Sequence, residues 1–147
     1  MEVKDYRAIR QTGKDLTSKI FKFAIDNNKE VLSYHASLFE VKSIDSGRNT
    51  SVLIDLLDPN RKEFTLMDIG LSQTSVVGLI FYTRLLPIQD IYMTSGVSFG
   101  FENSCKDKLI ATISLATFKK RNKLNTTEMF VLMHKKHQHF GLKIKTL

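Results

Sequence analysis

Two histidines near the C-terminal end have the spacing of a metal-binding pair. His137 and His139 form an H-x-H sequence, and in a β-strand such a pair can hold the metal ion of a nuclease if a third ligand completes the site. The surrounding residues instead predict the end of a helix, and no tyrosine follows that could complete a nuclease core. A small H-x-H nuclease is therefore the least favoured of three functions, and we expect no bound metal.

Three carboxylates and one thiol are the other groups that could do chemistry. Asp55, Asp58 and Asp68 could serve acid–base catalysis or hold a divalent cation if they converged, but their spacing does not aim them at one point. Cys105 is the only cysteine, which excludes an internal disulfide and a multi-cysteine zinc site and suits a reducing compartment. No phosphate-binding glycine motif is present. We expect a protein that is not an enzyme and has no cofactor.

Basic side chains interleaved with aromatic ones are the strongest chemical signal. They fall into two groups, and three phenylalanines lie near them in sequence. Cations that follow phosphates, together with aromatic rings on which bases stack, favour sequence-tolerant binding of single-stranded nucleic acid. The candidate binding residues are Lys119, Lys120, Arg121 and Lys123 in the first group and Lys135, Lys136 and His139 in the second, with Phe118, Phe130 and Phe140 nearby.

The charge of the chain is divided unevenly along its length. Up to Asn103 there are 12 Lys and Arg against 13 Asp and Glu, a net charge of −1. From Ser104 to Leu147 there are 10 basic residues against two acidic ones, a net charge of +8. Such asymmetry indicates a polyanionic partner, either nucleic acid or an anionic membrane surface. The alternative is a solvated cationic face that serves only solubility.

The residues between Thr50 and Phe118 predict the core that must position these groups. Short apolar runs rich in β-branched and aromatic residues are separated by turn sequences at intervals typical of an all-β fold. Pro87 is expected to bend or end its strand, and Asp45–Asn49 and Asp58–Arg61 are expected to be turns. The predicted strands are 52–57, 63–69, 78–86, 88–93, 97–101 and 109–118, with one or two more within 30–44.

Two helices are expected to flank this core. One runs from Asp15 to about Asn27. The other runs from Thr126 to His137, because Asn125 and Glu128 have the spacing of a capping box. Residues 1–13 are expected to form a flexible arm, residues 119–147 a basic C-terminal segment that begins with a linker, and residues 142–147 a short strand. The prediction is one α+β domain over residues 1–147, mostly β, with an antiparallel β-sandwich or jelly-roll-like core and a helix at each end.

Neither a secretory signal nor a membrane span is expected. The first 15 residues are charged and contain no apolar segment of the kind that signals need. No apolar run reaches the 18 residues that a spanning helix requires. These features predict an intracellular protein.

Several short motifs lie in the central half of the chain: Val52–Asp58 with Arg61, Gly78–Tyr82, Pro87 with Asp90, and Gly96–Phe101. Together they resemble the core of the thirty-kilodalton superfamily of plant-virus movement proteins. The resemblance implies a jelly-roll-like β core, nucleic-acid binding without sequence specificity, and a role at cell-to-cell channels, in the host cytoplasm or plasmodesmata.

Three functions therefore remain open. The first is a non-enzymatic protein that binds single-stranded nucleic acid, such as a small viral movement protein. The second is a matrix-like or regulatory protein that uses the same cations on an anionic membrane or a protein partner. The third is the H-x-H nuclease. The oligomeric state is left open.

Overall fold

The computed structural model describes residues 34–95 and 97–143. The chain divides into two units, Met1–Tyr34 and His35–Leu147, and every element described below lies in the second. The predicted arm, the predicted Asp15–Asn27 helix and most of the predicted terminal strand lie outside the described residues. Leu142 and Lys143, which are described, are not in a strand. Among the described helices, none combines the length and the apolar character needed to cross a bilayer.

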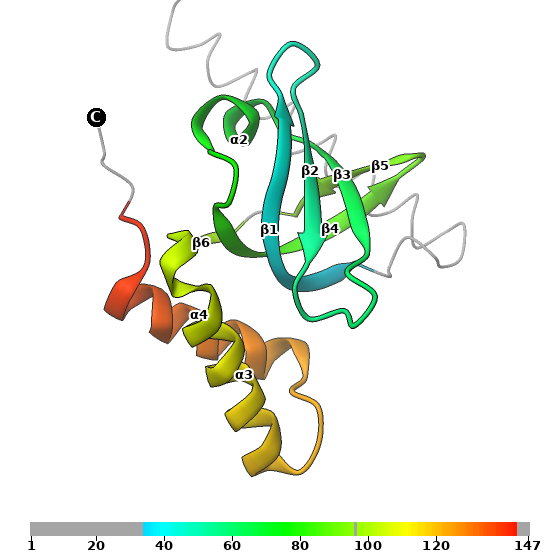
Figure 1. The fold of residues 1–147 in the computed structure, drawn as a ribbon. Helices are drawn as coiled ribbons and strands as arrows, with labels where there is room; N and C mark the ends of the chain where they lie inside the picture. The colour runs from blue at the N-terminus through cyan, green and yellow to red at the C-terminus, as the bar shows by residue number, and fades with distance from the viewer. Residues whose placement is uncertain (1–33, 96, 144–147) are drawn as a thin grey trace, which may run out of the picture. The chain divides into compact units, whose positions relative to one another are not determined.

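The described residues of the second unit form six strands and three α-helices (Figure 1). Helix α2 lies between the third and fourth strands, and α3 and α4 follow the last strand. The strands are β1 His35–Asp45, β2 Thr50–Asp55, β3 Glu63–Met67, β4 Ile80–Ile88, β5 Ile91–Thr94 and β6 Phe99–Phe101; the helices are α2 Ile69–Thr74, α3 Lys106–Lys120 and α4 Thr126–Phe140, with a 3-10 turn at Asn103–Cys105.

Five of the strands close into a barrel, so the predicted sandwich or jelly-roll-like core is wrong. The order is β1-β2-β3-β5-β4, and β4 pairs back with β1, while β6 lies outside and pairs with β4. Only the β3–β5 contact is parallel. Closure depends on β1, whose first half pairs with β4 and whose second half pairs with β2. Its register shifts between Val41 and Ser43, and such an irregularity lets a long strand bend.

The barrel interior is apolar and largely aromatic. It is filled by residues that point inward from β1 to β4, and Leu71 of α2 packs against them. Asp68 caps α2, because its carboxylate accepts a hydrogen bond from Leu71 N at 2.8 Å. The fully enclosed members are Phe39, Val41, Leu53, Phe64, Leu66, Phe81 and Leu85.

A second core lies between the outside of the barrel and the C-terminal helices. Leu38 of β1 and Ile80 and Tyr82 of β4 point outward and are buried. They are covered by β6 and by Leu109, Ile113 and Met133 of α3 and α4. Strands β1 and β4 are therefore buried on both faces, which explains why their sequences run apolar without strict alternation.

The predicted strand 109–118 is wrong, because these residues belong to α3. The alternation of Leu109, Ala111, Ile113 and Leu115 had suggested a half-exposed strand. In the helix, Leu109 and Ile113 are buried while Ala111 and Leu115 are exposed. The apolar residues at every second position therefore belong to two opposite faces of one helix, a buried face and an exposed apolar face, and not to one face of a strand.

Three predicted strand boundaries differ from those in the structure. β4 continues through Pro87 to Ile88, which is tolerated because β1 pairs with β4 only up to Leu85 and proline suits a singly paired stretch. The predicted 88–93 strand is divided by a turn at Gln89, whose φ is 55°. The last strand is limited to Phe99–Phe101.

Local signals were more reliable. The turns at 45–49 and 58–61 are confirmed, with left-handed backbone at Asn49 and Arg61. The predicted C-terminal helix is confirmed and continues to Phe140, and Asn125 and Glu128 form the expected capping box.

Gly141 joins α4 to β6 and leaves no room for a side chain. Gly141 N donates to His137 O at 2.9 Å, and the next amide, Leu142 N, donates to Gly100 O at 2.8 Å. A Cβ at this position would lie 2.1 Å from His137 Cδ2 and 2.6 Å from His137 O. A substitution must therefore displace backbone as well as a side chain.

We expect Gly141→Ala to lower the free energy of unfolding by about 1–3 kcal/mol, the usual cost of overpacking, and to lower Tm by several degrees. Gly47→Ala is the control, because its Cβ would meet only Asp45 Oδ1, at 3.4 Å. Thermal unfolding followed by circular dichroism measures both. Equal melting temperatures for the two variants would contradict this account of Gly141.

Candidate functional site

The connection between α3 and α4 is held in one conformation by local hydrogen bonds. Arg121 ends α3 in the left-handed region, with a φ of 61°. The Asn125 side chain accepts from Glu128 N at 2.8 Å, and the Glu128 carboxylate accepts from Asn125 N at 3.3 Å. Lys120 crosses from α3 to form an ion pair with Glu128, and it also donates to Lys123 O at 3.3 Å.

The Glu128 carboxylate neutralises Lys120. The hydrogen bond from Lys120 and a second one from the Asn125 backbone N–H lower the pKa of Glu128 below its usual value. Glu128 is therefore ionised at neutral pH. Lys120 stabilises the turn by its ion pair with Glu128, and its charge is not left for a binding partner. This role was missed from the sequence, although the capping spacing that places Glu128 there was recognised.

The predicted binding residues do not form one patch. Lys119, Arg121 and Lys123 are exposed at the α3–α4 connection, with no ion pair to any described residue. Lys135 is exposed in α4, nine residues after the helix begins at Thr126 and so roughly 14 Å along its axis from that end. Lys136 is partly buried and His139 is exposed, and both lie in the half of α4 that leads back to β6.

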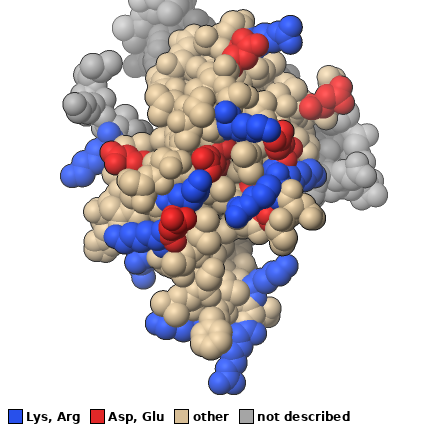
Figure 2. Space-filling model, viewed as in Figure 1, with Lys and Arg blue, Asp and Glu red and all other residues tan. Residues whose placement is uncertain are grey.

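The unit has two parts of opposite charge. Residues 35–103, which include the barrel, have five Lys and Arg against eight Asp and Glu, a net charge of −3. Residues 104–143 have nine against two, a net charge of +7. On the face that Figure 2 draws, Lys and Arg lie without neighbouring Asp or Glu at the end of the molecule where α3 meets the connection, and Glu128, at the start of α4, pairs with Lys120. A polyanion is therefore attracted to the helices and repelled by the barrel.

The barrel has the connectivity of a known binding architecture. A five-stranded barrel in the order β1-β2-β3-β5-β4, with a parallel β3–β5 contact and a helix between β3 and β4, is the arrangement of the oligonucleotide- and oligosaccharide-binding fold. Proteins with that fold use the surface of strands 2 and 3 and the β1–β2 and β4–β5 loops. Connectivity alone does not assign a function, so the chemistry of this surface must be considered.

The equivalent barrel surface offers little to a polyanion. All five cations of residues 35–103 are engaged within the described part of the chain. Lys42 pairs with Glu63 across β1 and β3, and the loop residue Arg48 pairs with Asp45. The other three contact oxygen or aromatic partners: Arg61 donates to Leu56 O, Lys62 lies 5.1 Å from the Phe64 ring centroid, and Arg84 lies 5.9 Å from that of Phe130.

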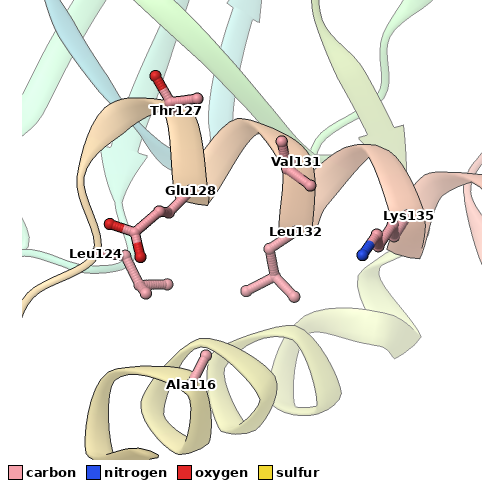
Figure 3. A pocket seen from close by; sticks show the side chains of 7 residues that line it. All are labelled: Ala116, Leu124, Thr127, Glu128, Val131, Leu132 and Lys135. Carbon is pink, nitrogen blue, oxygen red and sulfur yellow. The ribbon is translucent and has the colours of Figure 1, made fainter. Parts of the chain in front are cut away.

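An apolar groove of about 380 Å³ lies between α3 and α4 (Figure 3). Ala116 of α3 faces Leu132 of α4, and Val131, Glu128 and Lys135 also line the groove. Lys135 and the connection residue Leu124 lie at opposite ends of this groove. The full lining is Ala116, Leu124, Thr127, Glu128, Val131, Leu132 and Lys135.

A serine, a histidine and an aspartate meet at one end of the barrel but do not form a catalytic triad. Asp55 is only 2% exposed; its carboxylate lies 2.6 Å from His35 Nε2 and accepts from Ser37 Oγ at 2.5 Å and from Leu57 N at 2.9 Å. A triad requires the histidine to bond the nucleophile, whereas here Ser37 and His35 both bond the same carboxylate. The cluster therefore ties β1 to β2.

Asp58, Asp68 and His137 also have local partners. Asp58 accepts from Asn60 N and Asp68 caps α2. His137 contacts Leu142 O at 2.9 Å and packs on Phe99, whereas His139 is exposed, because residues two apart on a helix do not share a face. Within the described ranges, no three His, Cys, Asp or Glu residues are placed to hold a metal ion.

Comparison with known proteins gives one match. Residues 29–147 match the model of a family of unknown function (DUF7986). The chain belongs to this family. No curated protein and no solved structure matches the chain. The match covers the barrel and the basic helices together, so the family includes both parts of the unit.

The Asp55 cluster predicts a pH-dependent stability. Burial raises the pKa of Asp55, but hydrogen bonds from His35, Ser37 and Leu57 N outweigh burial and hold the pKa below its usual value. A carboxylate whose pKa is lower in the folded state stabilises the fold above its unfolded pKa, near 3.9, and loses that contribution as the pH falls through the folded pKa.

We expect Asp55→Asn to lower the free energy of unfolding at neutral pH by about 1–3 kcal/mol, with a smaller difference from wild type below about pH 3. Urea unfolding at several pH values measures this difference. Asp58→Asn, which alters an exposed turn carboxylate, is the control. A difference for Asp55→Asn that is equal at neutral and acidic pH would show that the ionised carboxylate is not what stabilises the barrel.

Proposed function

We propose that this chain binds single-stranded nucleic acid, without catalysis and without a cofactor, at the α3–α4 connection. The observation that carries the proposal is the set of exposed cations with no ion-pair partner among the described residues, held in residues 104–143, which have a net charge of +7, beside residues 35–103, which have a net charge of −3. The residues of the site are Lys119, Arg121 and Lys123 at the connection, with Lys135 at the far end of the groove between α3 and α4. Lys120 positions the turn, and Lys136 and His139 are left outside the site.

The arrangement of these cations favours a flexible strand. Lys119 is in the last turn of α3, while Arg121 and Lys123 are in the connection that follows, so the three do not follow one straight helix face. A single strand can adjust its phosphates to such a set, and contacts to phosphates alone carry no sequence information. Binding of this kind releases counterions and weakens steeply with salt.

The proposal is limited to binding. A closed barrel is not the jelly-roll-like core that the resemblance to movement proteins implied, so the fold adds no support for transport of a viral genome. The OB-type connectivity is compatible with nucleic-acid binding, but the charges favour the helices over the usual barrel surface.

We expect the variant Lys119→Ala/Arg121→Ala/Lys123→Ala to bind a fluorescent single-stranded oligonucleotide at least about tenfold more weakly than wild type in low salt. The plot of log affinity against log salt should also become shallower, by about 0.7 for each lost phosphate contact. Fluorescence anisotropy at several salt concentrations measures both quantities. Lys120 is retained so that its ion pair with Glu128 still holds the turn.

The matched control is Lys42→Ala/Arg48→Ala/Lys62→Ala, which removes the same charge from the barrel. It should leave affinity and salt dependence close to those of wild type. If the two triple variants lose equal affinity, net charge rather than the α3–α4 connection governs binding. If the first variant binds like wild type, the site is wrong.

A further inference from the structure

Helix α3 is apolar on two opposite faces, and only one of them is covered. Leu109 and Ile113 face the barrel and are buried. On the other side, Leu115 is 53% exposed and Phe118 is 79% exposed. Burying a leucine or phenylalanine is worth about 1.5–3 kcal/mol relative to leaving it in water, so a partner that covered both side chains would gain stability from them.

The exposed residues form a short stripe. Ala111, Leu115 and Phe118 are spaced i, i+4, i+7, which places them along one side of the helix over roughly 10 Å. Asp107 is the one acidic residue of α3, and it lies in the first turn, eleven residues and roughly 16 Å before Phe118. The C-terminal half of the stripe therefore has no acidic neighbour on its own helix.

Cations surround the Phe118 end of this stripe. Lys119, Arg121 and Lys123 follow it directly, are exposed, and pair with no acidic residue among those described. In Figure 1 this end of α3 and the connection lie farthest from the barrel. Figure 2 shows basic but not acidic side chains there. A flat anionic surface can therefore approach it without meeting the acidic barrel.

We propose that the outer face of α3 docks on a bilayer that contains anionic lipid. Leu115 and Phe118 enter the interfacial region, and Lys119, Arg121 and Lys123 contact anionic headgroups, the combination by which amphipathic helices bind membrane surfaces. The site shares its cations with the proposed nucleic-acid site, but it also requires Leu115 and Phe118, which nucleic-acid binding by cations does not.

Two other occupants fit the observations less well. In a symmetric pair of copies, the cations around one stripe would face those around the other, and this repulsion opposes association. A nucleic acid can stack a base on Phe118, but Leu115 and Ala111 offer no stacking face. A lipid surface that contains anionic headgroups satisfies the aliphatic residues and the cations together.

The direct test uses flotation of the full chain with vesicles of phosphatidylcholine, with and without phosphatidylserine. Wild type should float with the phosphatidylserine vesicles only. Leu115→Ser/Phe118→Ser should reduce binding about tenfold or more and keep the wild-type circular dichroism spectrum and oligonucleotide affinity. The control is Val76→Ser/Val77→Ser, which alters two residues that are 65% exposed after α2 and should float like wild type.

A second measurement reads insertion itself. The chain contains no tryptophan, so Phe118→Trp introduces a single tryptophan, whose emission should shift to shorter wavelength with phosphatidylserine vesicles and not with phosphatidylcholine alone. Val76→Trp should show no shift with either.

Several results would overturn the proposal. These are no flotation of wild type, equal flotation of the Leu115→Ser/Phe118→Ser variant, or no emission shift for Phe118→Trp. Loss of oligonucleotide affinity in that serine variant, without lipid binding by wild type, would assign the stripe to nucleic acid. A wild-type dimer that the serine variant dissociates would assign it to self-association. Retained oligonucleotide binding alongside failed flotation would reject this inference and leave the proposed nucleic-acid function intact.

Discussion

Burial of β1 and β4 on both faces is the constraint on which the rest of this structure depends. Phe39 and Phe81 fill the barrel, while their neighbours Leu38, Ile80 and Tyr82 point outward and are equally buried. Each such side chain contributes about 1.5–3 kcal/mol when it is removed from water, so the outer surface of the barrel needs its cover. Helices α3 and α4 are therefore part of the core rather than a basic tail attached to a finished domain.

Because α3 and α4 are packed against the barrel, one unit contains an acidic part, residues 35–103, and a basic part, residues 104–143. The inner faces of α3 and α4 are fixed by apolar contacts, and the connection between them is fixed by the Lys120–Glu128 ion pair and the Asn125 cap. The backbone that carries the remaining cations is therefore already held in place, which lowers the entropic cost of ordering it on binding. The barrel cations have partners of their own. The OB-type connectivity therefore favours a site on the surface of β2 and β3, whereas the charge distribution favours the α3–α4 connection. We choose the connection, because a polyanion is attracted directly by unpaired cations.

What could be predicted from the sequence was local. The turns at 45–49 and 58–61, the β2–β3 pair and the Asn125–Glu128 cap each depend on residues close together in the chain. The barrel does not, because its closure pairs His35 with Leu85, fifty residues away, and bends β1 near Ser43. Helix α3 was mistaken for a strand since its apolar outer face imitated alternation. The basic residues were recognised from the sequence. Only the structure shows that they are divided among a turn, a groove and the far half of α4, and that Glu128 neutralises Lys120.

The central claim is that the α3–α4 connection, and not the barrel surface, receives a single-stranded nucleic acid. Backbone amide chemical shifts of the labelled chain, followed while a single-stranded oligonucleotide is added, test it residue by residue. We expect the amides of residues 119–123 and Lys135 to shift in a saturable way that salt reverses, while those of β2, β3 and the 45–49 loop stay in place. Shifts confined to β2, β3 and that loop would contradict the account.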